Sequence, residues 1–267
     1  MTTTTPTTVS EGLTTERRGR VLVVTIDRPD RMNALSQSVH DGLRATWASL
    51  ADDDEIRAIV ITGAGTRAFC TGMDLKEFAE RGKAAEAQPN VHDELRTTPL
   101  ECGCWIPTII AVNGVCTGAG FHFIADADIV VASSTATFLD THVSVGQVTA
   151  LEPISLMPRI GLGNALKFSV LGKHGRIDAR EAHRISLVDE VVEPDQLLDR
   201  AVELGELIAT GSPSAILASK KAVRGALERP MAEAMQHGWE LLLEFREHPD
   251  NREGPMAFVE KREPRWQ

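Results

Sequence analysis

The chain has 267 residues, which is enough for one large α/β domain or for a domain with an appendage. Apolar residues make up 42% and charged residues 25% of it, as in an ordinary soluble globular protein. The net charge is −10 with scattered Lys and Arg, which argues against nucleic acid as a partner because phosphate binding needs a basic stripe. No run of about 18 apolar residues is present, so we expect no membrane span.

Along the chain, a Thr-rich polar stretch comes first, and strand and helix patterns then alternate to about residue 195. Residues 1–18 lack the apolar run of a secretory signal, and we expect a disordered tail. Apolar runs that end at Gly, Pro or Ser predict buried strands at 20–29, 56–65, 107–114 and 128–133. Helical periodicity predicts helices at 36–53 and within 74–104. Residues 19–195 should therefore form an α/β core whose parallel sheet is covered on both faces.

Residues 196–267 carry helical patterns and no strand signal. The patterns cover 195–210, 213–228, 230–248 and 252–262. Their Leu- and Met-rich faces exceed what a short hairpin buries alone. We expect this helical region to pack on the core or on another subunit.

The cysteines, at positions 70, 102, 104 and 116, do not form a CxxC pair. The CGC of 102–104 has no second pair to complete a zinc site, so we expect a structural role and no metal. Free thiols fit a reducing cytosol better than secretion, which predicts a cytoplasmic protein.

Two loops carry the chemical signal. Residues 68–78 (AFCTGMDLKEF) and 113–123 (NGVCTGAGFHF) each follow a predicted strand, contain glycine and open a helix. Helix N-termini expose unpaired N–H groups, and two such ends aimed at one point make an oxyanion hole. Each loop alone also suits a tight strand-to-helix connection, and neither matches a dinucleotide fingerprint or a P-loop.

With their flanks, these loops make the sequence resemble the crotonase superfamily, the enoyl-CoA hydratases and isomerases. The resemblance runs from about residue 20 to the C-terminus. The matching segments are DRPDRMNAL (27–35), AFCTGMDL (68–75), IIAVNG (109–114), DIVVASSTATF (128–138), VLGKHGRIDAREAHRISLVDEVV (170–192) and EKREPRW (260–266). The resemblance implies a spiral of ββα turns and a helical C-terminal region that builds trimers, often paired as hexamers. It implies an acyl-CoA substrate, with CoA part of that substrate and no metal or redox cofactor.

The resemblance also places site residues. The oxyanion donors would be the N–H groups of Met73 and Ala119, which would hold the thioester oxygen as an enolate forms. Substrate-binding positions would be Asn33, Ala34 and Leu35 in an adenine-contacting loop, Ala68 in a second adenine and pantetheine segment, and Gly72, Asp74, Leu75 and Gly118. Phe258 and Lys261 match a C-terminal helix that often reaches the CoA of a neighbouring subunit, although Lys261 also suits a solvated charge.

The sequence departs from the hydratase pattern at both catalytic glutamates. His122 stands two residues after the GAG triplet, and His142 stands in FLDTH where the second glutamate is usual, with Thr141 in place of proline. Histidine performs acid–base chemistry near pH 7, and a helix N-terminus should favour the neutral ring of His122. On an extended segment Asp140 would face the same way as His142 and orient it. Glu152 falls where some family members place an alternative carboxylate.

These residues leave several functions open. The first is hydration, dehydration or isomerisation of an acyl-CoA through a thioester enolate. The second is retro-Claisen hydrolysis of a C–C bond in a β-keto substrate by water that a His–Asp pair activates. The third is an acyl-CoA-binding protein without catalysis, since loss of both glutamates fits that as well. A buried histidine can also be a packing residue.

Overall fold

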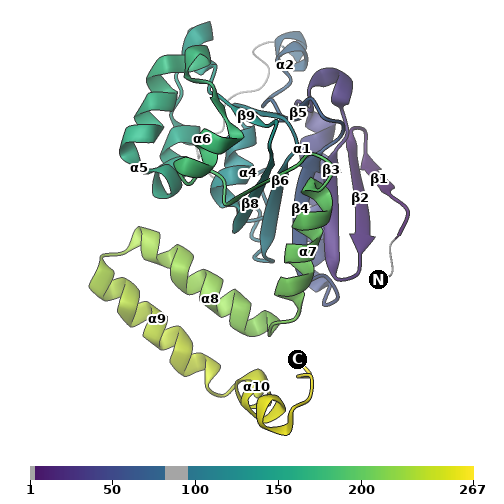
Figure 1. Cartoon of the computed structure of the whole chain (residues 1–267), viewed down its shortest axis with the longest axis vertical. Coiled ribbons are helices and arrows are strands. Elements are labelled where there is room, and N and C mark those ends of the chain that lie inside the picture. The colour runs from purple at the N-terminus through teal and green to yellow at the C-terminus, as the bar shows by residue number, and fades with distance from the viewer. Residues whose placement is uncertain (1–3, 82–95) are drawn as a thin grey trace.

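The structure, a computed structural model, describes residues 4–81 and 96–267. At its centre is a sheet whose strands β3, β4, β6, β8 and β11 run parallel, and whose edge, formed by β1 and β2, is antiparallel (Figure 1). In spatial order the sheet contains β1 (Thr7–Ser10), β2 (Leu13–Arg18), β3 (Val21–Ile26), β4 (Ala58–Gly63), β6 (Thr108–Val112), β8 (Ile129–Ser133) and β11 (Glu190–Val192). A smaller sheet has the order β10 (Ile177–Asp178), β9 (Thr137–Phe138), β7 (Val115–Cys116) and β5 (Ala68–Cys70). The α/β core expected from the sequence is confirmed.

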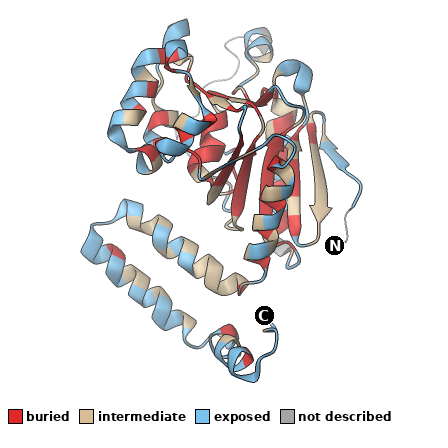
Figure 2. Ribbon diagram, in the orientation of Figure 1, coloured by how far each residue is buried: buried red, intermediate tan, exposed pale blue. Residues whose placement is uncertain are grey.

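Both faces of the large sheet are buried, as Figure 2 shows for its central strands. The helices of the core are α1 (Gln37–Ser49), α2 (Leu75–Arg81), α4 (Gly120–Asp126), α5 (Leu151–Leu171), α6 (Ala179–Arg184) and α7 (Leu197–Ala209). Alternate residues of β6 point to opposite sides: Ile109 joins the cluster under α7, and Ile110 joins the larger cluster with α1 and α4. Among the described helices, none combines the length and apolar character needed to cross a membrane.

The expectation of a disordered tail at 1–18 is wrong for the residues that the structure describes. Strands β1 and β2 form an antiparallel hairpin, and β2 pairs along its whole length with β3. The turn uses Gly12 at φ 83°, and Leu13 is fully buried. Threonine is β-branched and favours strands, so the composition that suggested disorder also suits a sheet edge.

The helix expected within 74–104 is present only in part. Residues 75–81 form α2, residues 82–95 lie outside the described part, and residues 96–104 form turns. Pro99 lies within this turn region, and its carbonyl accepts from the N–H of Cys102 and of Cys104. Gly103 adopts φ 79°, which ends any helical continuation.

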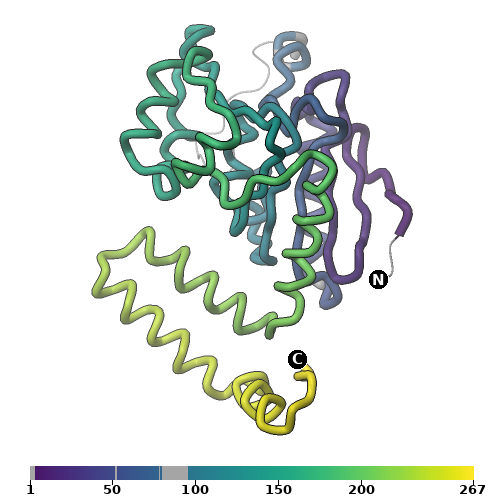
Figure 3. Tube along the Cα trace, viewed as in Figure 1, coloured from purple at the N-terminus to yellow at the C-terminus, as the bar shows by residue number. Residues whose placement is uncertain are grey.

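The C-terminal helices form an arm that extends from the core (Figures 1 and 3). Helices α8 (Pro213–Gly225) and α9 (Met231–Phe245) run side by side, and α10 (Pro249–Glu260) follows. Large apolar side chains of the arm are exposed at Val223, Leu227, Met231, Met235, Trp239, Leu242, Phe258 and Val259. This isolated chain therefore leaves a wide apolar surface on the arm uncovered.

One contact ties the arm to the core at the end of α4. The Arg224 guanidinium on α8 donates to the backbone carbonyls of Ala125, Asp126 and Ala127, at 3.3, 2.5 and 2.9 Å. Nearby, Lys220 Nζ lies 2.6 Å from a carboxylate oxygen of Asp128. Arg224 thus supplies donors to carbonyls that a helix end leaves without partners.

The cysteines fall into two classes, which predicts their reactivity. Cys70 and Cys116 are fully buried, and burial raises the pKa of the Cys70 thiol to about 12. Burial raises the pKa of the Cys102 and Cys104 thiols as well, but these two residues are only half-buried and remain accessible to solvent. Because the thiolate is the reactive form, we expect a thiol reagent to modify Cys102 and Cys104 of the native protein and all of the cysteines after denaturation. Mass mapping of the labelled peptides checks this, and native labelling of Cys70 would contradict it.

Candidate active site

The two glycine-containing loops, 68–78 and 113–123, contact each other at Gly72 and Gly118. A Cβ on Gly72 would lie 3.1 Å from the backbone nitrogen of Ala119 and 3.5 Å from the Cα of Gly118. Gly72 and Gly118 also adopt φ values of 86° and 55°, which L side chains rarely take. Conformation thus favours glycine at both positions, and the close approach of the two loops adds to this at Gly72.

The amides expected to act as oxyanion donors lie at this contact. Leu35 and Met73 form an isolated β-bridge that uses the backbone groups on either side of Met73. The Leu35 N–H donates to the Gly72 carbonyl at 2.8 Å, and the Asp74 N–H donates to the Leu35 carbonyl at 3.0 Å. Across residues 4–81 and 96–267, no protein acceptor pairs with the N–H of Met73 or of Ala119. Ala119 is the residue just before α4, so its amide is one of those that a helix start leaves open.

The first histidine, His122, comes from the first turn of α4 and is buried. Its Nε2 lies 3.7 Å from Oε1 of Glu152. Glu152 is in the first turn of α5, where the helix N-terminus stabilises a negative charge. The sequence had pointed to this carboxylate only through the resemblance, and the fold brings it to the histidine.

The second histidine, His142, faces the same glutamate from another side. Its Nε2 lies 3.8 Å from Oε1 of Glu152, and its Nδ1 lies 3.1 Å from Oδ1 of Asp140. The ring is also beside the glycine loop, because a Cβ on Gly118 would come within 3.7 Å of its Cε1. Glu152 thus sits between two histidines next to the open amides.

Asp140 orients His142 as expected, but not on an extended segment. His142 begins a 3₁₀ helix, His142–Val145, and its own N–H donates to Oδ1 of Asp140 at 2.9 Å. The Thr149 hydroxyl donates to Oδ2 at 3.0 Å, and the Asp140 side chain is buried. The carboxylate therefore holds both the backbone and the ring of His142 through a turn.

The pKa of His122 shifts in the direction opposite to the expectation of a neutral ring. Burial alone would lower the pKa of His122, but Glu152 and the nearby carboxylates of Glu101 and Asp126 together raise it above its ordinary value. For Glu152, burial acts to raise the pKa, but the hydrogen bonds from His122 and from the backbone N–H of Glu152 itself, together with the charges of His122 and His142, lower it. The nearby carboxylates thus shift the pKa of His122 upward, toward the charged ring, and the histidines shift the pKa of Glu152 downward, toward the carboxylate.

The side chain of Asn33 holds the expected adenine-contacting loop in place. Asn33 is fully buried, accepts from the N–H of Arg28 at 3.0 Å, and donates to the carbonyls of Ala64 and Ala68 at 3.0 and 2.7 Å. Asn33 therefore ties neighbouring segments together and presents no free side-chain group. Ala34 is buried as well, and its carbonyl accepts from Arg28 at 2.6 Å.

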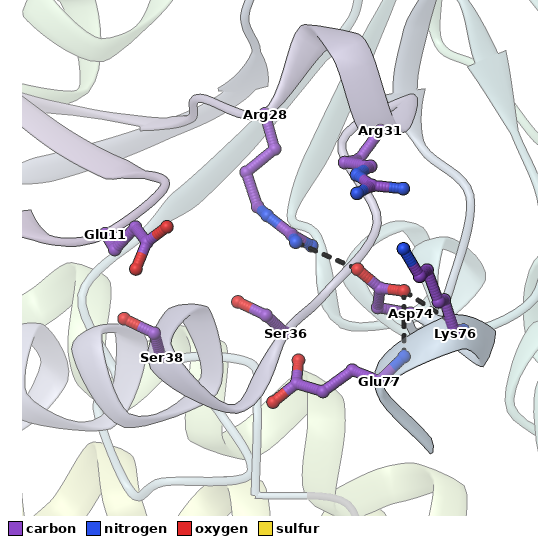
Figure 4. Close-up of a pocket in the computed structure, with 8 residues that line it drawn as sticks. All are labelled: Glu11, Arg28, Arg31, Ser36, Ser38, Asp74, Lys76 and Glu77. Carbon is purple, nitrogen blue, oxygen red and sulfur yellow. Dashed lines mark hydrogen bonds and ion pairs between the residues drawn. The ribbon is translucent and has the colours of Figure 1, made fainter. Parts of the chain in front are cut away.

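A pocket of about 280 Å³ lies beside this loop (Figure 4). Its lining is of mixed charge: Arg31 and Lys76 face Glu11 and Glu77, and Arg28 pairs with Asp74 at 2.8 Å. Burial acts to raise the pKa of Asp74, but the hydrogen bond from Arg28 and those from the start of α2 lower it. Next to Asp74, the Leu75 side chain is exposed. The pocket thus places basic and acidic groups in equal number next to the segment expected to bind CoA.

Two expected contact residues are not brought to this site within one chain. Phe258 is exposed on α10, and Lys261 caps the end of that helix at φ 54°. Figure 1 shows α10 at the opposite end of the molecule from α2 and β5. Their expected role requires a neighbouring subunit and stays a prediction.

Comparisons with known proteins agree on one family. A family profile described as enoyl-CoA hydratase/isomerase matches residues 16–267. The chain is 34% identical over 253 residues to (E)-benzylidenesuccinyl-CoA hydratase of Thauera aromatica, covering 94% of this chain and 97% of that one. It is 33% identical over 264 residues to carnitinyl-CoA dehydratase of Escherichia coli K12, covering 97% and 99%. A crystal structure of an enoyl-CoA hydratase/isomerase from Mycobacterium paratuberculosis superposes with a TM-score of 0.88 at 36% identity, covering 96% and 98%.

Proposed function

Because this chain belongs to the enoyl-CoA hydratase/isomerase family, and is thus an acyl-CoA-processing enzyme, we propose that it adds or removes water at the double bond of an acyl-CoA, or shifts that bond. The observation that carries the proposal is Glu152, placed 3.7 Å from His122 and 3.8 Å from His142. These groups lie beside the open amides of the glycine loops. The arrangement supplies proton donors and acceptors in place of the usual glutamates.

In this mechanism the amides of Met73 and Ala119 donate to the thioester oxygen and stabilise the enolate. Asp140 accepts the Nδ1–H of His142, which leaves the Nε2 lone pair free to accept a proton from water. The resulting hydroxide equivalent adds to the β-carbon, and His122, paired with Glu152, gives a proton to the α-carbon. Dehydration is the reverse sequence, and isomerisation moves the proton without water.

The relatives' names support water chemistry, since they are a hydratase and a dehydratase. We propose that the adenine end of CoA lies against Ala34 and Ala68, with the pantetheine arm passing Gly72, Leu75 and Gly118 toward the histidines. No metal or redox cofactor takes part in this chemistry.

A direct assay tests the proposal. Purified protein incubated with crotonyl-CoA should consume the enone absorbance, and mass spectrometry should find a product heavier by one water. A panel of other unsaturated acyl-CoA esters then ranks the acyl group. Binding of acyl-CoA without turnover of any member would overturn the proposal and leave a non-catalytic binding protein.

One observation favours a second function, retro-Claisen hydrolysis. His142 lies between Asp140 and Glu152, as a base that activates water for attack on a β-keto carbonyl would. Attack forms a tetrahedral adduct, whose C–C bond breaks to give an acid and an enolate that is then protonated. Release of a new acid from a β-diketone CoA ester, with crotonyl-CoA untouched, would select this reaction.

We also propose that the chain forms trimers or hexamers through its arm. The support is the exposed apolar surface of α8, α9 and α10, which exceeds what monomers usually leave in water. Sedimentation equilibrium should therefore give three or six times the chain mass of 29.0 kDa. A concentration-independent monomer would contradict this assembly, and with it the role of Phe258 and Lys261 at a neighbouring CoA.

A further inference from the structure

We propose that Glu101 is a positioning residue of the site, which acts through His122 and shifts that ring toward its charged form. The inference rests on the proposed function, in which His122 gives a proton to the α-carbon of the substrate. Glu101 was not among the residues that the sequence singled out, because nothing in the spacing along the chain relates it to the glycine loops. The fold brings it to the helix that carries His122.

The Glu101 carboxylate is fixed by its own turn. Its Oε2 accepts from the N–H groups of Thr97 and Thr98, each at 3.0 Å. The turn is anchored in the core, because the indole N–H of Trp47 on α1 donates to the Thr97 carbonyl at 2.8 Å and Thr98 is fully buried. These bonds hold the half-buried carboxylate in place.

Thr98 links this turn to α4. Its hydroxyl oxygen accepts from the N–H of Glu101 at 3.2 Å, and the hydroxyl donates to a carboxylate oxygen of Asp126, the last residue of α4. Asp126 stands four residues after His122, and side chains at that spacing lie on the same face of a helix. The turn that holds Glu101 therefore packs against the face of α4 that bears His122.

The negative charges that act on His122 come from three elements. Glu152 belongs to α5 and lies 3.7 Å from Nε2 of His122, Asp126 belongs to α4, and Glu101 belongs to the turn. Burial of the ring acts to lower the pKa of His122, whereas the hydrogen bond to Glu152, the charge of Glu101 and the charges of Glu152 and Asp126 raise it. The interaction is mutual: burial raises the pKa of Glu101, and the charge of His122 acts against that rise.

The other two carboxylates are shared with further charged groups, and this sets Glu101 apart. Glu152 also lies 3.8 Å from Nε2 of His142. The positive charges of Arg224 and Lys220 on α8 act on Asp126. Glu101 accepts from neutral backbone N–H groups, which leave its negative charge in place. Glu101 thus offsets the burial of the His122 ring without touching the substrate.

Substitutions at Glu101 separate its charge from its hydrogen bonds. Glu101→Gln removes the charge but keeps an oxygen for the N–H groups of the turn, and Glu101→Asp keeps the charge. NMR titration of the whole protein with isotope-labelled histidine, in which His122→Asn identifies the His122 signal, should find a lower pKa for His122 in Glu101→Gln and a smaller change in Glu101→Asp. Glu101→Ala removes the charge by a second route and should also lower this pKa. Glu193→Gln removes an exposed carboxylate and is the control, which should titrate as the wild type does.

The pH profile of turnover gives the functional readout. His122 must be charged to give its proton, so kcat/KM for hydration of crotonyl-CoA should fall as the pH rises through the pKa of His122. Loss of the Glu101 charge lowers that pKa, so the alkaline limb of Glu101→Gln should move to lower pH. On that limb we expect kcat/KM about 3- to 10-fold below the wild type, since one pKa unit is a factor of ten.

The outcomes separate this inference from the proposed function. The NMR titration needs no substrate, whereas turnover of crotonyl-CoA by the wild type tests the function alone. A His122 pKa that Glu101→Gln and Glu101→Ala leave unchanged would overturn the inference even if turnover is robust. A loss of kcat/KM that is equal at every pH would also contradict it, because it would show that Glu101 only supports the turn. Circular dichroism checks that each variant is folded.

Discussion

Replacing Ala119 by proline is expected to lower kcat by about 10²- to 10³-fold, the usual cost of losing one oxyanion donor. Proline removes the backbone N–H and fixes φ near about −65°, and Ala119 already has φ −55°. Its amide donates to no backbone or side-chain acceptor in the described part of the chain. The substitution therefore removes the donor while sparing the helix, and the assay with crotonyl-CoA measures the loss.

The control for this variant keeps the amide and changes the side chain. Ala119→Ser alters the same position with its N–H intact, so it should retain most of the wild-type kcat. Both variants should unfold thermally close to the wild type, because proline is tolerated at a helix start. An Ala119→Pro enzyme with unchanged kcat would remove this amide from the mechanism.

Replacing His142 by alanine should lower turnover by about 10²- to 10⁴-fold, because the proposed general base is lost. His122→Ala should fall in the same range, since it supplies the second proton transfer. Asp140→Asn keeps the side-chain shape but accepts less strongly from Nδ1–H, so we expect a smaller loss of kcat with KM little changed. Stopped-flow single turnovers measure the chemical step directly.

The exposed His174, in the 3₁₀ helix Gly172–Gly175, provides the control for these variants. His174→Ala removes an imidazole outside the site and should keep wild-type turnover. Equal rates for His122→Ala, His142→Ala and His174→Ala would show that neither site histidine acts in catalysis. That result would favour a binding protein over an enzyme.

The sequence predicted the α/β core and the contact between the two glycine loops because both depend on local signals. Continuous apolar runs indicated β4, β6 and β8, and glycine marked the loop ends. The strands of the small sheet, such as β9 and β10, have two residues each, and so short a segment has no periodicity to detect. The hairpin of β1 and β2 was missed because threonine is polar enough to suggest a tail and β-branched enough to form a strand.

In the candidate site, too, the residues with a local sequence signal were predicted and those that depend on tertiary packing were not. His122 and His142 were found because each stands at a fixed distance from a local motif. The place of Glu152 depends on how α5 packs against α4, which the spacing along the chain does not reveal. The direction of the His122 pKa shift was predicted from the helix end alone. The shift depends instead on carboxylates of other elements, such as Glu152 and Glu101.

The Arg224 contact links the arm to α4, the short helix that carries His122. A chain cut after α7 would lose the guanidinium that now bonds the last carbonyls of the short helix bearing His122. That helix has only 7 residues, so fraying from its free end would reach the histidine within a turn. We therefore expect removal of α8 to α10 to loosen α4 and lower turnover, even where the sheet survives intact.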